Sequence, residues 1–157
     1  MSKVVIIMGS KADLDWANQI VKVLDGFKIE NVVRIASAHK VPLKCYNLIK
    51  DYEKEGVVFI TIAGMSNALS GFADAQTHCP VIACPPYSDK FGGGDLYSSV
   101  RMPSGVAPMT ILSPENAALA AAKIIGLGNP SVREQIMAYQ EKKRNELEEA
   151  DQQLQSK

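Results

Sequence analysis

The sequence predicts an α/β domain built around a parallel β-sheet. Apolar runs of five to seven residues, rich in Val and Ile, alternate with longer segments in which apolar residues recur at helical spacing. This alternation is typical of parallel strands joined by crossover helices, because strands covered on both faces are apolar throughout. At 157 residues the chain is long enough to enclose one core without disulfides or metal. We therefore expect one domain over residues 1–157, with an α/β core over 1–128 and a terminal helix over 130–157.

The first half of the chain contains three expected strands. Residues 4–8 form the first strand, and the helix that follows it ends at Gly26. The apolar face of that helix consists of Ala17, Ile20, Val21 and Leu24. The second strand covers residues 29–36 and leads through a turn into a helix with Pro42 in its first turn. The third strand covers residues 57–63.

Two more strands are expected in the second half, over residues 81–84 and 109–112. Between them, residues 87–108 are rich in Gly, Ser, Pro and Asp, with a short helix near 95–101. This composition indicates a lid or a loop that covers a ligand.

Two helices should follow the last strand. The first begins at Ser113-Pro114, where Pro occupies the first helical position. The second follows Pro130, exceeds twenty residues, and carries an apolar stripe too narrow to be buried fully in its own domain. The stripe consists of Val132, Ile136, Tyr139 and Leu147. We therefore expect this helix to contact a neighbouring subunit.

The composition excludes several classes of partner. Lys and Arg total 17, as do Asp and Glu, so no net field attracts nucleic acid or an anionic membrane. The three cysteines include no C-x-x-C pair, which argues against a disulfide framework or a zinc site. The apolar start is too short for a signal peptide or a membrane span. We expect a cytoplasmic protein.

Ligands of an open parallel sheet bind at the carboxyl ends of its strands, so the turns after the first three strands are the places to search. The first turn lacks both G-x-G-x-x-G and the P-loop Gly-Lys-Ser/Thr, which argues against a dinucleotide or ATP. Gly9, Ser10 and the following helix start suit a single phosphate. A capping box formed by Ser10 and Asp13 explains the same residues equally well.

The second turn, Ser37-Ala38-His39-Lys40, is more informative. Ser37 and Lys40 suit a phosphate, which leaves His39 for proton transfer near neutral pH. The alternative is a half-buried histidine that donates to a backbone carbonyl. The other histidine, His78, precedes a strand and should lie at the opposite edge of the sheet, as a structural or surface residue.

The third turn offers backbone N–H groups and small polar side chains at Gly64, Ser66 and Asn67, which could hold a carboxylate. An ordinary helix N-cap is the alternative. We expect no metal, because no acidic or histidine cluster has ligand spacing. A nucleophilic pair of Cys84 and His39 is conceivable, but the cysteines stand in apolar contexts typical of a core.

Six spaced blocks resemble the PurE family of purine biosynthesis, which carboxylates aminoimidazole ribonucleotide. The similarity covers nearly the whole chain up to about Asn129. The blocks are Met8-Gly9-Ser10-x-x-Asp13, Ser37-Ala38-His39-Lys40-x-Pro42, Ala63-Gly64-x-Ser66-Asn67, Pro80-Val81-Ile82-x-Cys84-Pro85-Pro86, Asp95-x-x-Ser98-Ser99-x-Arg101-x-Pro103-Ser104-Gly105 and Leu112-Ser113-Pro114-Glu115.

Details of these blocks resemble the class that takes up carbon dioxide directly. The mutase class, which rearranges the N-carboxy isomer, has Arg where this chain has Lys40, and has Gly-Gly-Ala-Ala-His where this chain has residues 65–69. The vertebrate bifunctional carboxylase has Arg where this chain has Met65. The mutase reaction is the first alternative, and a flavin-binding electron carrier is a distant one that the fold alone would suit.

The resemblance implies a three-layer αβα, flavodoxin-like domain in a symmetric homo-oligomer, often an octamer. It implies that the ribose phosphate is bound by Ser10, Asp13, Ser37 and Lys40, with Asp13 nearer the ribose hydroxyls. Gly64 and Ser66 would lie near the imidazole, and Ser66-Asn67 where carbon dioxide docks. The electron-rich ring can attack carbon dioxide without ATP, biotin or metal, so no cofactor is expected. His39 is the expected base for the ring C4 proton.

Overall fold

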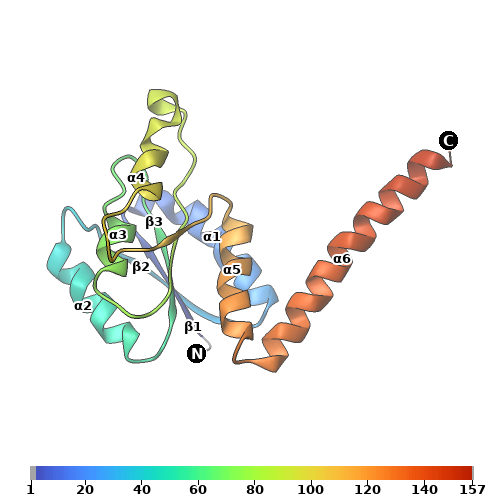
Figure 1. Cartoon of the computed structure of the whole chain (residues 1–157), viewed down its shortest axis with the longest axis horizontal. Helices are drawn as coiled ribbons and strands as arrows, with labels where there is room; N and C mark the ends of the chain where they lie inside the picture. The colour runs from blue at the N-terminus through green and yellow to red at the C-terminus, as the bar shows by residue number, and fades with distance from the viewer. Residues whose placement is uncertain (1–2, 157) are drawn as a thin grey trace.

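Five parallel strands form one sheet in the order β2-β1-β3-β4-β5 in the computed structural model, which describes residues 3–156 (Figure 1). The strands are β1 (Lys3–Met8), β2 (Glu30–Ile35), β3 (Val58–Ile62), β4 (Val81–Ala83) and β5 (Met109–Thr110). This order is that of flavodoxin-like folds, and the predicted fold class is confirmed. Met1, Ser2 and Lys157, which fall within the expected domain boundaries, lie outside the described residues.

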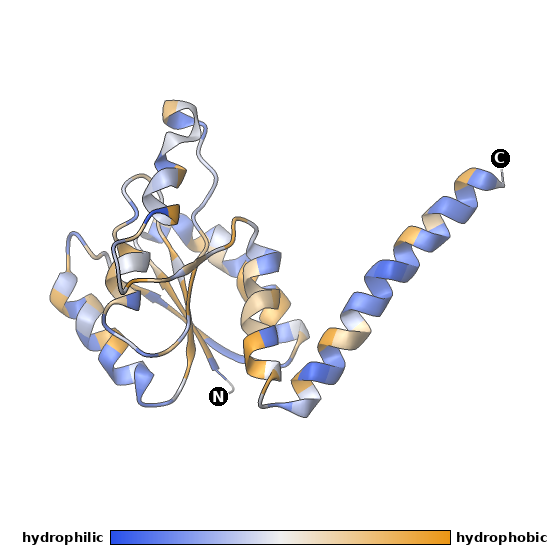
Figure 2. Ribbon diagram, in the orientation of Figure 1, coloured by the Kyte–Doolittle hydropathy of each residue, from blue (hydrophilic) through white to orange (hydrophobic). Residues whose placement is uncertain are grey.

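Helices cover both faces of the sheet. On one face, α1 (Leu14–Gly26) and α5 (Pro114–Gly126) pack against Val4, Ile6 and Met8 of β1. On the other face, α2 (Pro42–Glu53) and α3 (Leu69–Asp74) pack against Val5 and Ile7 of the same strand. Successive strand side chains point to opposite faces, so a strand between two helical layers must be apolar at every position. The apolar strands stand out against the bluer helix surfaces in Figure 2.

The terminal helix α6 (Pro130–Gln155) is anchored only at its start. The side chain of Asn129 accepts a hydrogen bond from the Val132 amide, and the Tyr139 ring meets the Phe27 ring edge-on at 5.4 Å between centroids. A Cβ on Gly126 would lie 3.3 Å from Cδ1 of Ile136, so the two helices approach closely where α5 ends. Beyond this region α6 projects away from the domain (Figure 1).

The expected stripe on α6 therefore has two parts. Val132 and Ile136 are buried against the domain and Tyr139 packs on Phe27, whereas Leu147 is 73% exposed. Leu154, which was not part of the predicted stripe, is 72% exposed. None of the helices over residues 3–156 combines the length and apolar character that crossing a membrane requires.

The long segment between β4 and β5 contains a 3-10 helix, η2 (Lys90–Leu96), and one turn of α-helix, α4 (Tyr97–Val100), close to the expected short helix. Phe91, Gly92 and Gly93 have consecutive positive φ angles of 54°, 62° and 75°. After α4 the chain is tied to α3, where the amide of Ala107 donates to the Asp74 carboxylate at 2.7 Å. We call residues 87–108 the cover, after the role predicted for them, and residues 87–94 its tip. The hydrogen bond from Ala107 attaches the cover to α3.

Candidate active site

The turns after β1, β2 and β3 meet at the carboxyl end of the sheet and enclose a cavity of about 280 Å³. Six of the eight predicted site residues line it: Ser10, Asp13, Ser37, His39, Gly64 and Ser66. Lys40 and Asn67 do not belong to its lining. The cavity also includes residues that sequence reasoning did not single out for the site: Ala12, Ala38, Ala63, Leu69 and Pro86. Parallel strands bring these distant turns together because all their carboxyl ends lie at one edge.

The first turn is shaped by a local cap. The hydroxyl of Ser10 accepts a hydrogen bond from the Ala12 amide at 3.1 Å, at the start of the 3-10 helix η1 (Lys11–Asp13). Burial raises the pKa of the Asp13 carboxyl, and a hydrogen bond from the Ser10 backbone opposes that shift. These contacts agree with the alternative in which Ser10 and Asp13 cap the helix start. The Ser10 hydroxyl proton still remains for a ligand, because a hydroxyl both accepts and donates.

Hydrogen bonds within the second turn hold its conformation. The hydroxyl of Ser37 accepts from the Lys40 amide at 3.2 Å, and the Ser37 carbonyl accepts from the Val41 amide at 3.0 Å. Lys40 and His39 are exposed at the crest of this turn. Within residues 3–156 the His39 imidazole has no hydrogen-bond partner, so the structure does not show a histidine tied to a backbone carbonyl. Its nitrogens are available to a ligand in the cavity.

The third turn has an unusual backbone at Met65, where φ is +60° and the side chain is 73% exposed. Asn67 is 5% exposed and faces the protein. Its Nδ2 donates to the Ser99 hydroxyl at 2.9 Å, and its Oδ1 accepts from the Ser70 amide at 3.2 Å. The second contact is the i to i+3 contact typical of an N-cap. The structure therefore brings Asn67 to the turn but engages its side chain internally.

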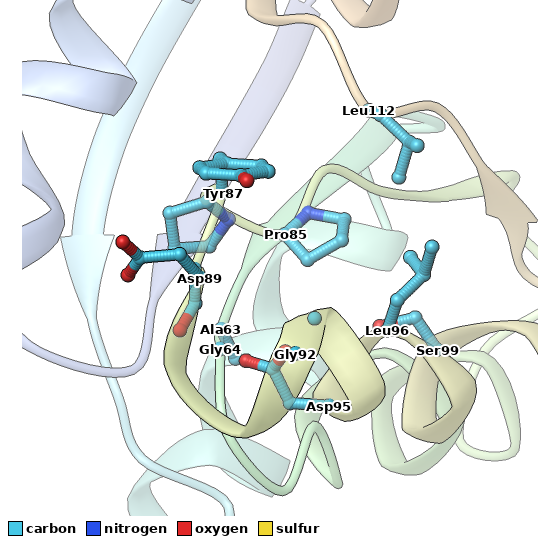
Figure 3. Close-up of a pocket in the computed structure, with 13 residues that line it drawn as sticks. Ala63, Gly64, Pro85, Tyr87, Asp89, Gly92, Asp95, Leu96, Ser99 and Leu112 are labelled. Atoms are coloured by element: carbon cyan, nitrogen blue, oxygen red, sulfur yellow. The ribbon is translucent and has the colours of Figure 1, made fainter.

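A second cavity of about 450 Å³ adjoins the first beneath the tip of the cover (Figure 3). Ala63, Gly64 and Pro86 line both cavities. Its remaining walls come from the segment after β4 and from Leu112. The residues from that segment are Pro85, Tyr87, Ser88, Asp89, Gly92, Gly93, Asp95, Leu96 and Ser99. The Gly-rich composition of residues 87–108 predicted a loop near the ligand, but no local pattern indicated which of its residues line a cavity.

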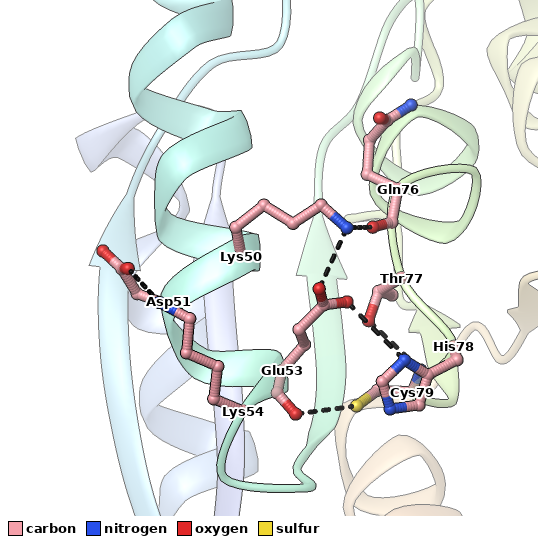
Figure 4. A network of polar contacts seen from close by, with 8 residues as sticks. All are labelled: Lys50, Asp51, Glu53, Lys54, Gln76, Thr77, His78 and Cys79. Carbon is pink, nitrogen blue, oxygen red and sulfur yellow. Dashed lines mark hydrogen bonds and ion pairs between the residues drawn. The ribbon is translucent and has the colours of Figure 1, made fainter.

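The other candidate groups lie away from these cavities. His78 is exposed at the opposite edge of the sheet, with Nδ1 3.8 Å from Oε2 of Glu53 (Figure 4), as expected for a surface residue. A hydrogen bond from Lys50 is the main cause that lowers the pKa of the Glu53 carboxyl. Cys84 is fully buried, and burial raises its pKa to about 11, so its thiol stays protonated and belongs to the core. Residues 3–156 contain no group of three His, Cys, Asp or Glu side chains that could hold a metal.

A 2-1-3-4-5 parallel sheet with a small cavity at its carboxyl edge, whose lining includes serine hydroxyls, a carboxyl and an imidazole, defines a flavodoxin-like α/β enzyme that acts on a small ligand. Comparison with known proteins identifies the family within this class. The AIR carboxylase family model matches residues 3–146, so the chain belongs to the AIR carboxylase family.

Similar proteins agree with this assignment. A phosphoribosylaminoimidazole carboxylase of Archaeoglobus fulgidus is 62% identical over 152 residues, which is 97% of this chain and 84% of that protein. The crystal structure of Treponema denticola PurE superposes with a TM-score of 0.94 at 44% identity and covers 97% of this chain and 98% of that one. A bifunctional phosphoribosylaminoimidazole carboxylase/phosphoribosylaminoimidazole succinocarboxamide synthetase of Mus musculus is 43% identical over 81% of this chain, which corresponds to 30% of that protein.

Proposed function

We propose that this protein is a phosphoribosylaminoimidazole carboxylase of de novo purine biosynthesis, acting in the cytoplasm. The observation that carries the proposal is His39, whose imidazole has no hydrogen-bond partner among residues 3–156 and lines a cavity with hydroxyl and backbone groups suited to a phosphorylated nucleotide. Membership of the AIR carboxylase family and the 62% identity to a phosphoribosylaminoimidazole carboxylase support the same reaction.

The proposed substrate is 5-aminoimidazole ribonucleotide. Ser10, Ser37 and Lys40 bind its phosphate, because each offers a hydrogen-bond donor at or beside the cavity. Asp13 accepts from the ribose hydroxyls. Gly64 and Ser66 border the ring and the incoming carboxylate. Asn67, which is buried, completes this part of the site from the same turn.

The reaction requires two changes at ring C4. The enamine electron pair of the ring attacks the carbon of carbon dioxide, so a C–C bond forms and the electron pair of one C–O π bond moves onto oxygen, which gives a carboxylate. The C4 proton then passes to His39, and its bonding pair restores the aromatic ring. The cavity orients both reactants and limits their contact with water. The reverse sequence is decarboxylation, which makes the enzyme a lyase that uses no ATP, biotin or metal.

An assay under carbon dioxide scavenging separates this reaction from the mutase alternative. Purified protein is given either aminoimidazole ribonucleotide with bicarbonate and no scavenger, or the N-carboxy isomer with carbon dioxide scavenged, and formation of the C4-carboxylated nucleotide is followed. We expect product from the first mixture, and none from the isomer while carbon dioxide is removed, because Lys40 and Ser66-Asn67 match the direct carboxylase class. Product from the isomer that survives scavenging would contradict the carboxylase assignment.

A homo-oligomer, with the octamer as the expected form, belongs to the same proposal. Leu147 and Leu154 are seven residues apart and continue the helix face that Val132 and Ile136 bury against the domain. This face has no partner in its own chain over residues 3–156, so a second copy covers it.

The double substitution Leu147→Lys with Leu154→Lys tests this contact by sedimentation. We expect the sedimenting mass of the wild-type oligomer to fall, because two charges replace apolar contacts on one face. The matched control is Asn145→Lys with Gln152→Lys, which adds the same charge on the opposite, exposed face and should keep the mass. An unchanged mass for the leucine variant would exclude this face from assembly.

A further inference from the structure

The Asp95–Ser99 stretch lies against the third turn of the active site, although it belongs to the cover. Asp95 Oδ2 accepts from the Met65 amide at 3.3 Å, and the Ser98 hydroxyl lies 3.1 Å from the Met65 carbonyl. The same hydroxyl accepts from the Asn67 amide at 2.9 Å. The amides of Met65 and Asn67 are therefore bound by two side chains of the cover. The single proton of the Ser98 hydroxyl is shared between the Asp95 carbonyl at 2.7 Å and the Met65 carbonyl at 3.1 Å.

Met65 is the residue in this turn that most needs such support. Its φ of +60° is a left-handed conformation that a residue with a side chain adopts only at a cost. Its side chain is mostly exposed, so packing of that side chain contributes little to the conformation. The bonds from the Met65 amide to Asp95 and from the Asn67 amide to Ser98 are the contacts that hold the backbone there.

Ser99 supports the other end of the turn. It is 1% exposed, and its hydroxyl accepts from Nδ2 of the buried Asn67 at 2.9 Å. Its carbonyl accepts from the Thr110 hydroxyl of β5 at 2.8 Å. The cover is thereby fixed to the sheet at the point where it holds the turn.

We propose that Asp95, Ser98 and Ser99 form a clamp that positions residues 64–67, and with them Ser66, for the carboxylation step. These three are positioning residues, because they act through the turn. The assignment rests on the proposed function for its catalytic consequence, whereas the hold on the turn does not depend on that function. It also gives Asn67 a role as the buried link between turn and clamp.

Kinetics distinguish positioning from a purely structural role. Asp95→Ala and Ser98→Ala should lower kcat by about tenfold, because a reacting group displaced by a fraction of an ångström loses alignment. The dissociation constant of the nucleotide should change less than about threefold, since Ser10 and Ser37 lie on other turns. Asp95→Asn keeps an oxygen acceptor for the Met65 amide and should restore most of the rate.

Two controls complete the kinetic test. Ser131→Ala makes the same chemical change at an exposed site on α6 and should leave kcat unchanged. The thermal unfolding midpoint should stay close to that of the wild type in both clamp variants. A kcat within twofold of wild type for Ser98→Ala, or a loss of rate that Asp95→Asn shares equally with Asp95→Ala, would overturn the clamp.

Amide hydrogen exchange provides a readout that does not require turnover. The Met65 and Asn67 amides should exchange at least about tenfold faster in Ser98→Ala than in the wild type, because the turn opens locally. Unchanged exchange at both amides would overturn the clamp. A wild-type protein that fails to carboxylate the nucleotide would instead overturn the proposed function, and exchange would still decide whether the clamp exists.

Discussion

Replacing His39 by Asn is expected to lower the rates of carboxylation and of decarboxylation by a factor of about 10²–10⁴, the usual contribution of a general acid–base group. Asn has similar size and polarity but cannot take up the C4 proton at neutral pH. Both directions should lose rate together, because they share one transition state. Initial rates at saturating nucleotide measure the loss, and calorimetry should show nucleotide affinity within a few-fold of wild type.

The second histidine of the chain is the matched control for this experiment. His78 lies at the opposite edge of the sheet and is exposed, so His78→Asn should retain the wild-type rate in both directions. Near-normal turnover of the His39→Asn variant would remove His39 from the mechanism. Equal losses in the two variants would point to a general effect on folding.

Replacing Phe59 by Ala is expected to lower the free energy of unfolding by about 3–5 kcal/mol, as is usual when a buried aromatic ring is removed. Phe59 is fully buried on the central strand β3, where its ring packs between the sheet and the α2–α3 layer. The surrounding helices cannot collapse fully into the space, so a cavity remains. A domain of ordinary stability, about 5–15 kcal/mol, would lose a large share of it.

Urea unfolding at one fixed protein concentration measures this change, since assembly makes stability concentration-dependent. Phe91→Ala removes the same ring from a side chain that is 94% exposed and should change stability by less than about 0.5 kcal/mol. A loss below about 1 kcal/mol for Phe59→Ala would show that this part of the core tolerates a cavity.

Sequence patterns located the elements well where burial is strong. All residues of β1 from Val4 to Met8 are buried, and the apolar run that predicted the strand covers the same residues. The β4–β5 edge of the sheet was predicted less accurately, because the expected strands over 81–84 and 109–112 are observed as strands over Val81–Ala83 and Met109–Thr110. A strand ends where its neighbour stops pairing, and no local run of residues records that position.

In the site, too, features set by local sequence were predicted and features set by distant contacts were not. Ser10 follows the buried strand β1, and Ser37 and His39 follow the partly exposed edge strand β2, so the rule that ligands bind at strand carboxyl ends was sufficient to group them. The position of Asn67 near carbon dioxide stays a prediction, but the contact of its side chain with Ser99, which lies 32 residues further along the chain, was not predicted. Contacts at such separation depend on how the cover returns to the sheet.

The sequence by itself determined the α/β class, the alternation of strands and helices, and the candidate base His39, because each depends on the local order of apolar and polar residues. Only the tertiary structure decided how residues 87–108 are placed, which side chains support the turn at Met65, and where α6 leaves the domain. These features result from contacts between segments far apart in the chain, and their free energy is gained only after the sheet has brought those segments together.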